Sequence, residues 1–125
     1  MSELVFDLVL ALFIAHELDA MQRHEWRIFP ILRNLPDAVA HLLFTLVHVP
    51  LLVVFFWLMN NALAQQWFRP ALSAFAMVHV WLHWLMRHHP RYELNNRLSW
   101  GLIVATGLAG ALHLGTLAAT TFIAL

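Results

Sequence analysis

Four long apolar segments, separated by short polar stretches, set the pattern of this 125-residue chain. The segments cover residues 4–21, 38–59, 70–86 and 99–125. Each is close to the ~20 residues that an α-helix needs to cross the hydrocarbon core of a bilayer. Lipid leaves unpaired backbone groups without water, which favours helices there. The pattern therefore predicts an all-α fold, a four-helix transmembrane bundle that forms a single domain over residues 1–125.

The composition agrees with a membrane protein. Hydrophobic residues make up 62% of the chain and charged residues only 11%, against ~25% charged residues in a typical soluble domain. The net charge is zero, which gives no support for nucleic-acid binding. Cysteine is absent, so disulfides, thiolate metal ligands and cysteine nucleophiles are excluded. Membrane lipids are the expected partners, and a homo-oligomer is compatible with this composition.

Arginine residues predict how the bundle is oriented. All seven basic residues are arginine, and six of them lie in the two connections that follow the first and third spans. The positive-inside rule places these connections in the cytoplasm and both termini outside. The expected location is the bacterial inner membrane. In the fourth span, Gly107, Gly110 and Gly115 permit close packing against a neighbouring helix.

The stretch "HELDAMQRHEW" ends the first span and carries its carboxylates, Glu17 and Asp19, beside His16. A carboxylate at a span centre costs ~2.5–3.5 kcal/mol, so both are expected to face the bundle interior or the cytoplasmic boundary. An alternative is structural: Asp19 pairs with Arg23, and Glu17 is a hydrated helix end.

We expect this stretch to form one continuous helix, of which the first part is the wall of a site. On that view Arg23, Glu25 and Arg27 lie at or beyond the headgroups, and Trp26 is an interfacial anchor.

Histidines in the second and third spans suggest a metal. His79 and His83 are four residues apart on one helix face, the spacing that lets two imidazoles share an ion. They lie at a depth similar to that of the carboxylates of the first span. The predicted metal ligands are His16, Glu17, Asp19, His48, His79 and His83. Residues expected to orient these ligands are His41, Arg23, Arg87, Glu93 and Asn96.

The leading interpretation is a membrane metalloenzyme. Imidazoles with carboxylates suit a divalent transition metal such as zinc or iron, as one ion or two. The reaction would be that of a di-iron oxidase or oxygenase, or of a zinc hydrolase, on a lipid-like or other apolar substrate. Glu17 is the expected bridging ligand or general base, and Asp19 is expected to orient Arg23 or a histidine.

Two other interpretations remain open. His48 and His79 on facing helices could be the axial ligands of a haem in an electron-transfer protein. Alternatively, the chain is a non-catalytic membrane subunit in which the polar cluster only joins the helices. Polar contacts between membrane helices average only ~0.6 kcal/mol, so this many ionisable groups would be a costly way to gain specificity.

Several motifs resemble those of an uncharacterised bacterial family of small four-helix integral membrane proteins. They are "HELDA" followed by "HEWR", then "HVP", "HVWLHW" and "HPRYELNN". The chain is also distantly similar to the membrane proteins named for a His-x-x-Glu-Glu motif. The resemblance implies the four spans but supplies no reaction. It singles out His16, Glu17, Asp19, Glu25, Trp26, His48, His79, His83, Glu93 and Asn96.

Overall fold

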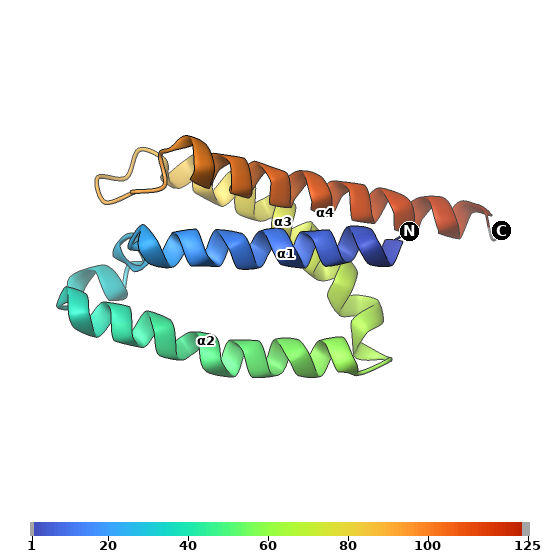
Figure 1. Cartoon of the computed structure of the whole chain (residues 1–125), viewed down its shortest axis with the longest axis horizontal. Coiled ribbons are helices and arrows are strands. Elements are labelled where there is room, and N and C mark those ends of the chain that lie inside the picture. The colour runs from blue at the N-terminus through green and yellow to red at the C-terminus, as the bar shows by residue number, and fades with distance from the viewer. Residues whose placement is uncertain (1, 124–125) are drawn as a thin grey trace.

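A computed structural model describes residues 2–123, and these form an all-α structure without strands, as the sequence predicts. The four long helices run back and forth along one axis (Figure 1). Two short 3-10 helices lie in the connection between the first two long helices. In chain order the elements are α1 (Ser2–Gln22), η1 (Glu25–Ile28), η2 (Leu32–Asn34), α2 (Asp37–Asn60), α3 (Ala64–Met86) and α4 (Arg97–Ile123).

The packed centre of the molecule is made by α1, α3 and α4, because α4 lies against both of the others. The approach of α4 to α3 depends on glycine. A Cβ atom at Gly107 would lie 2.4 Å from Val80 Cγ2, and one at Gly110 would lie 2.5 Å from the carbonyl oxygen of Ser73. A hydrogen bond of 2.7 Å joins Ser73 Oγ to His113 Nδ1 across the same two helices.

Helix α2 stands to one side of this centre (Figure 1). It contacts α3, η1 and η2, and most of its apolar side chains are exposed. By length and composition, α2 and α4 are the two described helices that could cross a membrane.

Helix α3 is longer than expected, because it begins at Ala64 and not at Pro70. Asn61 explains the earlier start. Its Oδ1 accepts hydrogen bonds from the backbone N–H groups of Leu63 and Ala64, at 3.1 and 3.0 Å, and so satisfies donors that the first turn leaves free. Pro70 then lies within the helix.

The expectation of one continuous helix through "HELDAMQRHEW" is wrong. Helix α1 ends at Gln22, and His24 adopts a left-handed conformation with φ 54° and ψ 43°. This conformation costs a non-glycine residue ~1–2 kcal/mol. The chain turns there, and Glu25 and Trp26 are buried at 6% and 3% exposure.

Burial and hydrogen bonding offset the cost of this turn. Trp26 packs with Ala40 and Phe44 of α2, and its indole N–H donates to Asp37 Oδ1 at 3.1 Å. Arg27 donates to both oxygens of Asp37, at 2.9 and 2.8 Å. Trp26 is thus a core residue that fixes the start of α2, and it is not an interfacial anchor.

Candidate metal centre

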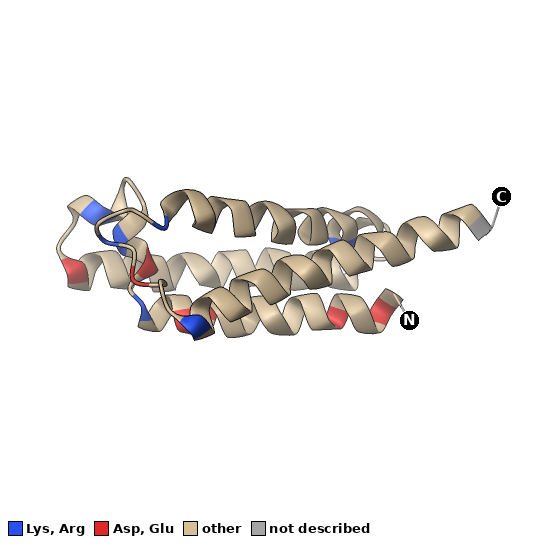
Figure 2. Cartoon of the chain, turned by 90° about the horizontal axis from the view of Figure 1, so that it is seen from above, with Lys and Arg blue, Asp and Glu red and all other residues tan. Residues whose placement is uncertain are grey.

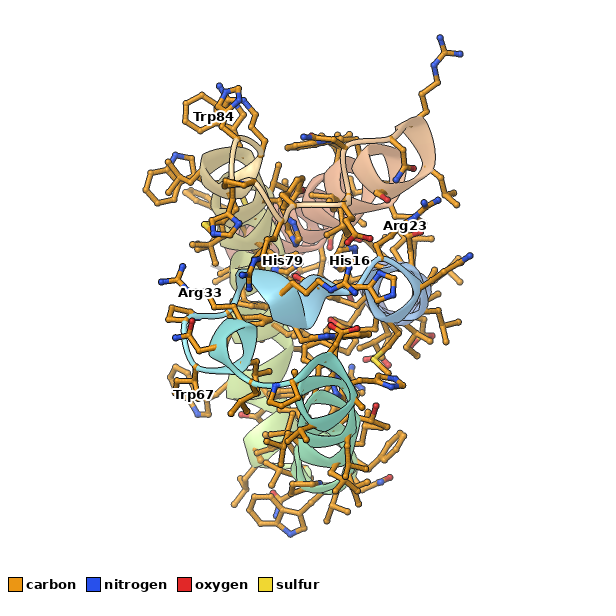
Figure 3. All side chains as sticks on the ribbon, turned by 90° about the vertical axis from the view of Figure 1, so that its left-hand side faces the viewer. His16, Arg23, Arg33, Trp67, His79 and Trp84 are labelled. Atoms are coloured by element: carbon orange, nitrogen blue, oxygen red, sulfur yellow. The ribbon has the colours of Figure 1, made fainter. Side chains whose placement is uncertain are left out.

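Three histidines from two helices bring their ring nitrogens to one point. His16 Nε2 of α1 lies 3.0 Å from His79 Nε2 of α3, and His79 Nε2 lies 3.0 Å from His83 Nε2 one turn further along. Ligand atoms of the three residues all lie within 4.8 Å of one another, so the group could hold a metal ion. His16 and His83 are buried, at 0% and 3% exposure. Figure 3 shows His16 and His79 between their helices, inside the bundle.

Hydrogen bonding alone does not account for this arrangement. A neutral imidazole nitrogen has either one proton to donate or one lone pair to accept. His79 Nε2 faces two other Nε2 atoms, so at most one of its two contacts is a hydrogen bond. A cation would take the lone pairs of all three nitrogens. Tetrahedral zinc with bonds of 2.0–2.1 Å separates its nitrogen ligands by ~3.3 Å, close to the 3.0 Å that separates His79 Nε2 from each of the other two Nε2 atoms.

Glu25 is the carboxylate that approaches this group. Its Oε1 lies 3.5 Å from His83 Nε2. Burial raises the pKa of the Glu25 carboxyl to about 8, and the charges of Glu17 and Asp19 add to the rise. A cation beside it would favour the carboxylate form. The family resemblance singles out Glu25. The sequence prediction nevertheless placed Glu25 outside the site, because it assumed that α1 continues through His24.

Tyr92 contacts the imidazole of His83 at Nδ1, the ring nitrogen that is not turned to His79. Its hydroxyl lies 3.0 Å from His83 Nδ1, and both side chains are buried. With Nδ1–H donating to the Tyr92 oxygen, the lone pair of His83 Nε2 points at the other two histidines. Burial also raises the pKa of the Tyr92 hydroxyl, so it stays protonated. Tyr92 was not among the residues predicted for the site, although it lies within the motif "HPRYELNN". His16 Nδ1 is buried and has no hydrogen-bond partner among the described residues.

Glu17 and His48 form a separate pair, apart from the three histidines. Glu17 Oε2 lies 3.2 Å from His48 Nε2, and His48 Nδ1 lies 2.6 Å from the carbonyl oxygen of Phe44. A carbonyl only accepts, so Nδ1 carries a proton. This pair links α1 to α2.

Asp19 is buried and links α1 to α4 through a hydrogen bond. It accepts a short hydrogen bond from Ser99 Oγ, and its other oxygen lies 3.6 Å from Arg23 Nε. Asn96 supports Ser99, because its Oδ1 accepts from the Ser99 backbone N–H at 3.0 Å and caps α4. The Asp19–Arg23 pair of the structural alternative is therefore present.

The other side chains expected to orient ligands make their contacts elsewhere. His41 stacks on Trp26, with ring centroids 4.7 Å apart. Arg87 lies over the ring of Trp84, which Figure 3 shows at the periphery. Glu93 accepts from Arg27 Nη1 at 2.6 Å and lies 2.9 Å from His24 Nδ1.

The fold and this cluster define a small all-α protein that could hold a metal ion through three buried histidines. The chain belongs to a family of unknown function, DUF6713, whose model matches residues 2–120. This confirms the resemblance to an uncharacterised family. Comparisons with curated proteins and with solved structures give no match.

Proposed function

We propose that this chain is an integral membrane metalloprotein that binds one divalent transition-metal ion and catalyses hydrolysis of a lipid-like substrate. His16, His79 and His83 are the ligands. Glu25 lies beside this group, with its Oε1 3.5 Å from His83 Nε2. The proposal is carried by one observation: His79 Nε2 lies 3.0 Å from both His16 Nε2 and His83 Nε2, yet a single imidazole nitrogen cannot form a hydrogen bond with each of them.

The exposed surface of α2 supports a membrane location. Only 6% of its most apolar stretch is buried inside the molecule, so the apolar side chains of this helix are not a protein core. Such a surface in water would promote aggregation. In a bilayer the same side chains are solvated by lipid. Helices α1 and α3 carry the polar groups that face the interior, and we propose that they complete a four-span bundle.

The ligand set favours a single ion of the zinc type. Glu25 is the carboxylate in contact with the histidines, whereas Glu17 and Asp19 are hydrogen-bonded to other partners. A carboxylate-bridged pair of irons would need more carboxylates at one point. Zinc held by three imidazoles supplies an activated water for hydrolysis. An apolar substrate is expected because the site lies within the proposed membrane domain.

The haem alternative has less support. His79 Nε2 is turned to His16 and His83, while both ring nitrogens of His48 have partners in Glu17 and Phe44. A pair of axial ligands would instead direct one nitrogen each at a shared iron. An absorption spectrum of the purified protein distinguishes the two, because a haem protein absorbs strongly in the visible region.

Metal analysis of the purified protein tests the proposal. The protein would be purified in mild detergent without added metal, and bound ions counted by elemental mass spectrometry. We expect about one zinc or comparable ion per chain in the parent and a strong loss in the double variant His79→Ala, His83→Ala.

His88→Ala is the matched control, because His88 is an exposed histidine beyond the end of α3. This variant should keep the metal content of the parent. A parent protein that binds no transition metal, even after zinc is added, would leave the polar cluster with a structural role only.

A further inference from the structure

A cavity opens at the end of the molecule where most of the arginines lie. It has a volume of about 420 Å³ and lies between η1, η2, the start of α2 and the α3–α4 connection. Arg27, Arg33 and Arg91 line it together with Asp37 and Glu93. None of the three histidines lines this cavity, so it is distinct from the metal centre. Figure 2 shows the basic residues concentrated at this end.

The two carboxylates of the cavity are already engaged. Asp37 accepts from Arg27 Nε and Nη2, and Glu93 accepts from Arg27 Nη1 and also lies against His24. Arg27 therefore has its guanidinium fully occupied by two carboxylates. This network builds the walls of the cavity and sets one arginine against two carboxylates, so Arg33 and Arg91 bring the net charge of the five side chains to +1.

Arg33 and Arg91 are without a carboxylate partner among residues 2–123. Arg91 Nη1 donates to the backbone carbonyl of Arg33 at 2.6 Å, which holds the two residues together. The guanidinium of Arg33 has no hydrogen bond within the described part of the chain. Arg33 and Arg91 both line the cavity, and each keeps guanidinium donors that no described residue accepts, which is the chemistry that binds the oxygens of a phosphate group.

Exposed apolar side chains flank Arg33 in the segment that joins η1 to α2. Phe29, Ile31 and Leu35 are exposed, and Ile31 is 80% exposed. A free phosphate site in water has no need of them. In a membrane surface, apolar side chains enter the acyl region while arginine meets the headgroup phosphate. Basic pockets at the ends of membrane helices bind anionic headgroups by this combination.

We infer that this cavity binds the phosphate of an anionic phospholipid headgroup through Arg33 and Arg91, with Phe29 and Ile31 inserted among its acyl chains. The inference rests on the membrane location proposed above and is independent of the metal ion. It identifies a lipid that is bound at a defined site, in addition to the lipids that merely surround the helices.

Lipid titration in detergent tests this site. The full-length protein would be stripped of lipid and titrated with short-chain phosphatidylglycerol, phosphatidylcholine or inorganic phosphate, and bound lipid would be counted by native mass spectrometry. We expect phosphatidylglycerol to bind the parent at least tenfold more tightly than phosphatidylcholine, and inorganic phosphate to compete weakly. Phosphate that binds as well as the lipid would show a small-anion site and overturn the lipid assignment.

Arg33→Gln is the informative variant, because the Arg91 hydrogen bond uses the backbone carbonyl of residue 33 and survives the change. We expect a fall of roughly tenfold in affinity for phosphatidylglycerol. Arg87→Gln is the matched control, since Arg87 lies over Trp84 and does not line the cavity. An equal fall in both variants would show non-specific charge attraction and overturn the site.

Two further readouts separate this inference from the proposed function. Unchanged metal content in Arg33→Gln would show that the variant is folded, so that its lipid affinity reports on the cavity alone. Protein that stays monomeric and folded without detergent would contradict the membrane location and with it both proposals. Protein that needs detergent but binds all three ligands equally would overturn only the lipid site.

Discussion

The hydroxyl oxygen of Tyr92 lies 3.0 Å from Nδ1 of His83. Tyr92, in the α3–α4 connection, therefore orients the His83 ring, whose Nε2 lies 3.0 Å from His79 Nε2. Tyr92→Phe removes this partner while keeping the ring. Partners of this kind typically change metal affinity 10–100-fold, so we expect a loss of ~10-fold or more in zinc affinity. Competition with a chromogenic chelator measures it. Unchanged affinity would mean that His83 does not depend on Tyr92 for its tautomer.

Two glutamates of this region should behave differently. Glu25 Oε1 lies 3.5 Å from His83 Nε2, whereas Glu17 is bonded to His48. We expect Glu25→Gln to weaken zinc binding by ~10-fold, because the neutral amide removes a negative charge beside the cation. Glu17→Gln should keep the metal affinity of the parent, because Glu17 contacts His48 and not the three histidines. The reverse order of metal affinities would place Glu17 at the metal.

The close approach of α3 and α4 predicts an asymmetric effect of two glycine substitutions. Gly110→Ala places a Cβ atom 2.5 Å from the Ser73 carbonyl oxygen, so the helices must separate, at a cost of ~1–3 kcal/mol in the free energy of unfolding. Gly115→Ala meets nothing within 4 Å and should be neutral or stabilising by up to ~1 kcal/mol. Thermal unfolding in detergent compares the two, and equal melting temperatures would contradict the packing described here.

Glu93 predicts a pH dependence of stability. Partial burial acts to raise the pKa of its carboxyl, but hydrogen bonds from His24 and Arg27 outweigh this and leave the pKa lowered. A carboxyl with a lowered pKa in the folded state stabilises the protein above its unfolded pKa of ~4.3. That contribution is lost as the pH falls through the folded-state pKa.

The measurement is the difference in melting temperature between the parent and Glu93→Gln as a function of pH. We expect the parent to be more stable at pH 7, by less than ~1 kcal/mol because the pair is partly exposed. The difference should shrink below pH ~4.3. A difference that is constant from pH 7 to pH 3 would show that charge is not its cause.

The distribution of arginine predicts the orientation of the proposed bundle. Reporter domains fused after the C-terminus and inserted in the α3–α4 connection should be found on opposite sides of the membrane, with the connection in the cytoplasm. A cytoplasmic C-terminus would reverse the orientation. It would leave the metal centre unchanged, because all connections would invert together.

Local periodicity was enough to predict the helices and part of the metal site. The apolar segments gave four helices, with ends misplaced by several residues only at the start of α3. His79 and His83 share a helix face by the geometry of 3.6 residues per turn, whatever surrounds them. The prediction of His16 as a ligand rested on its depth in the first span, because a buried polar side chain in an apolar span needs partners at a similar depth.

Tertiary structure decided which polar residues meet. The left-handed turn at His24 reverses the chain and brings Glu25 to His83. No pattern within α1 indicates this turn, because its stabilising contacts are made by later residues. Trp26 bonds to Asp37 of α2, and Arg27 bonds to Glu93 of the α3–α4 connection. Glu17 and Asp19 were expected to share the metal, but rotation about α1 directs them to His48 and Ser99. Sequence thus determined which side chains are placed in the bundle. Their partners depend on helix rotation and on contacts between residues far apart in the chain, which local periodicity does not encode.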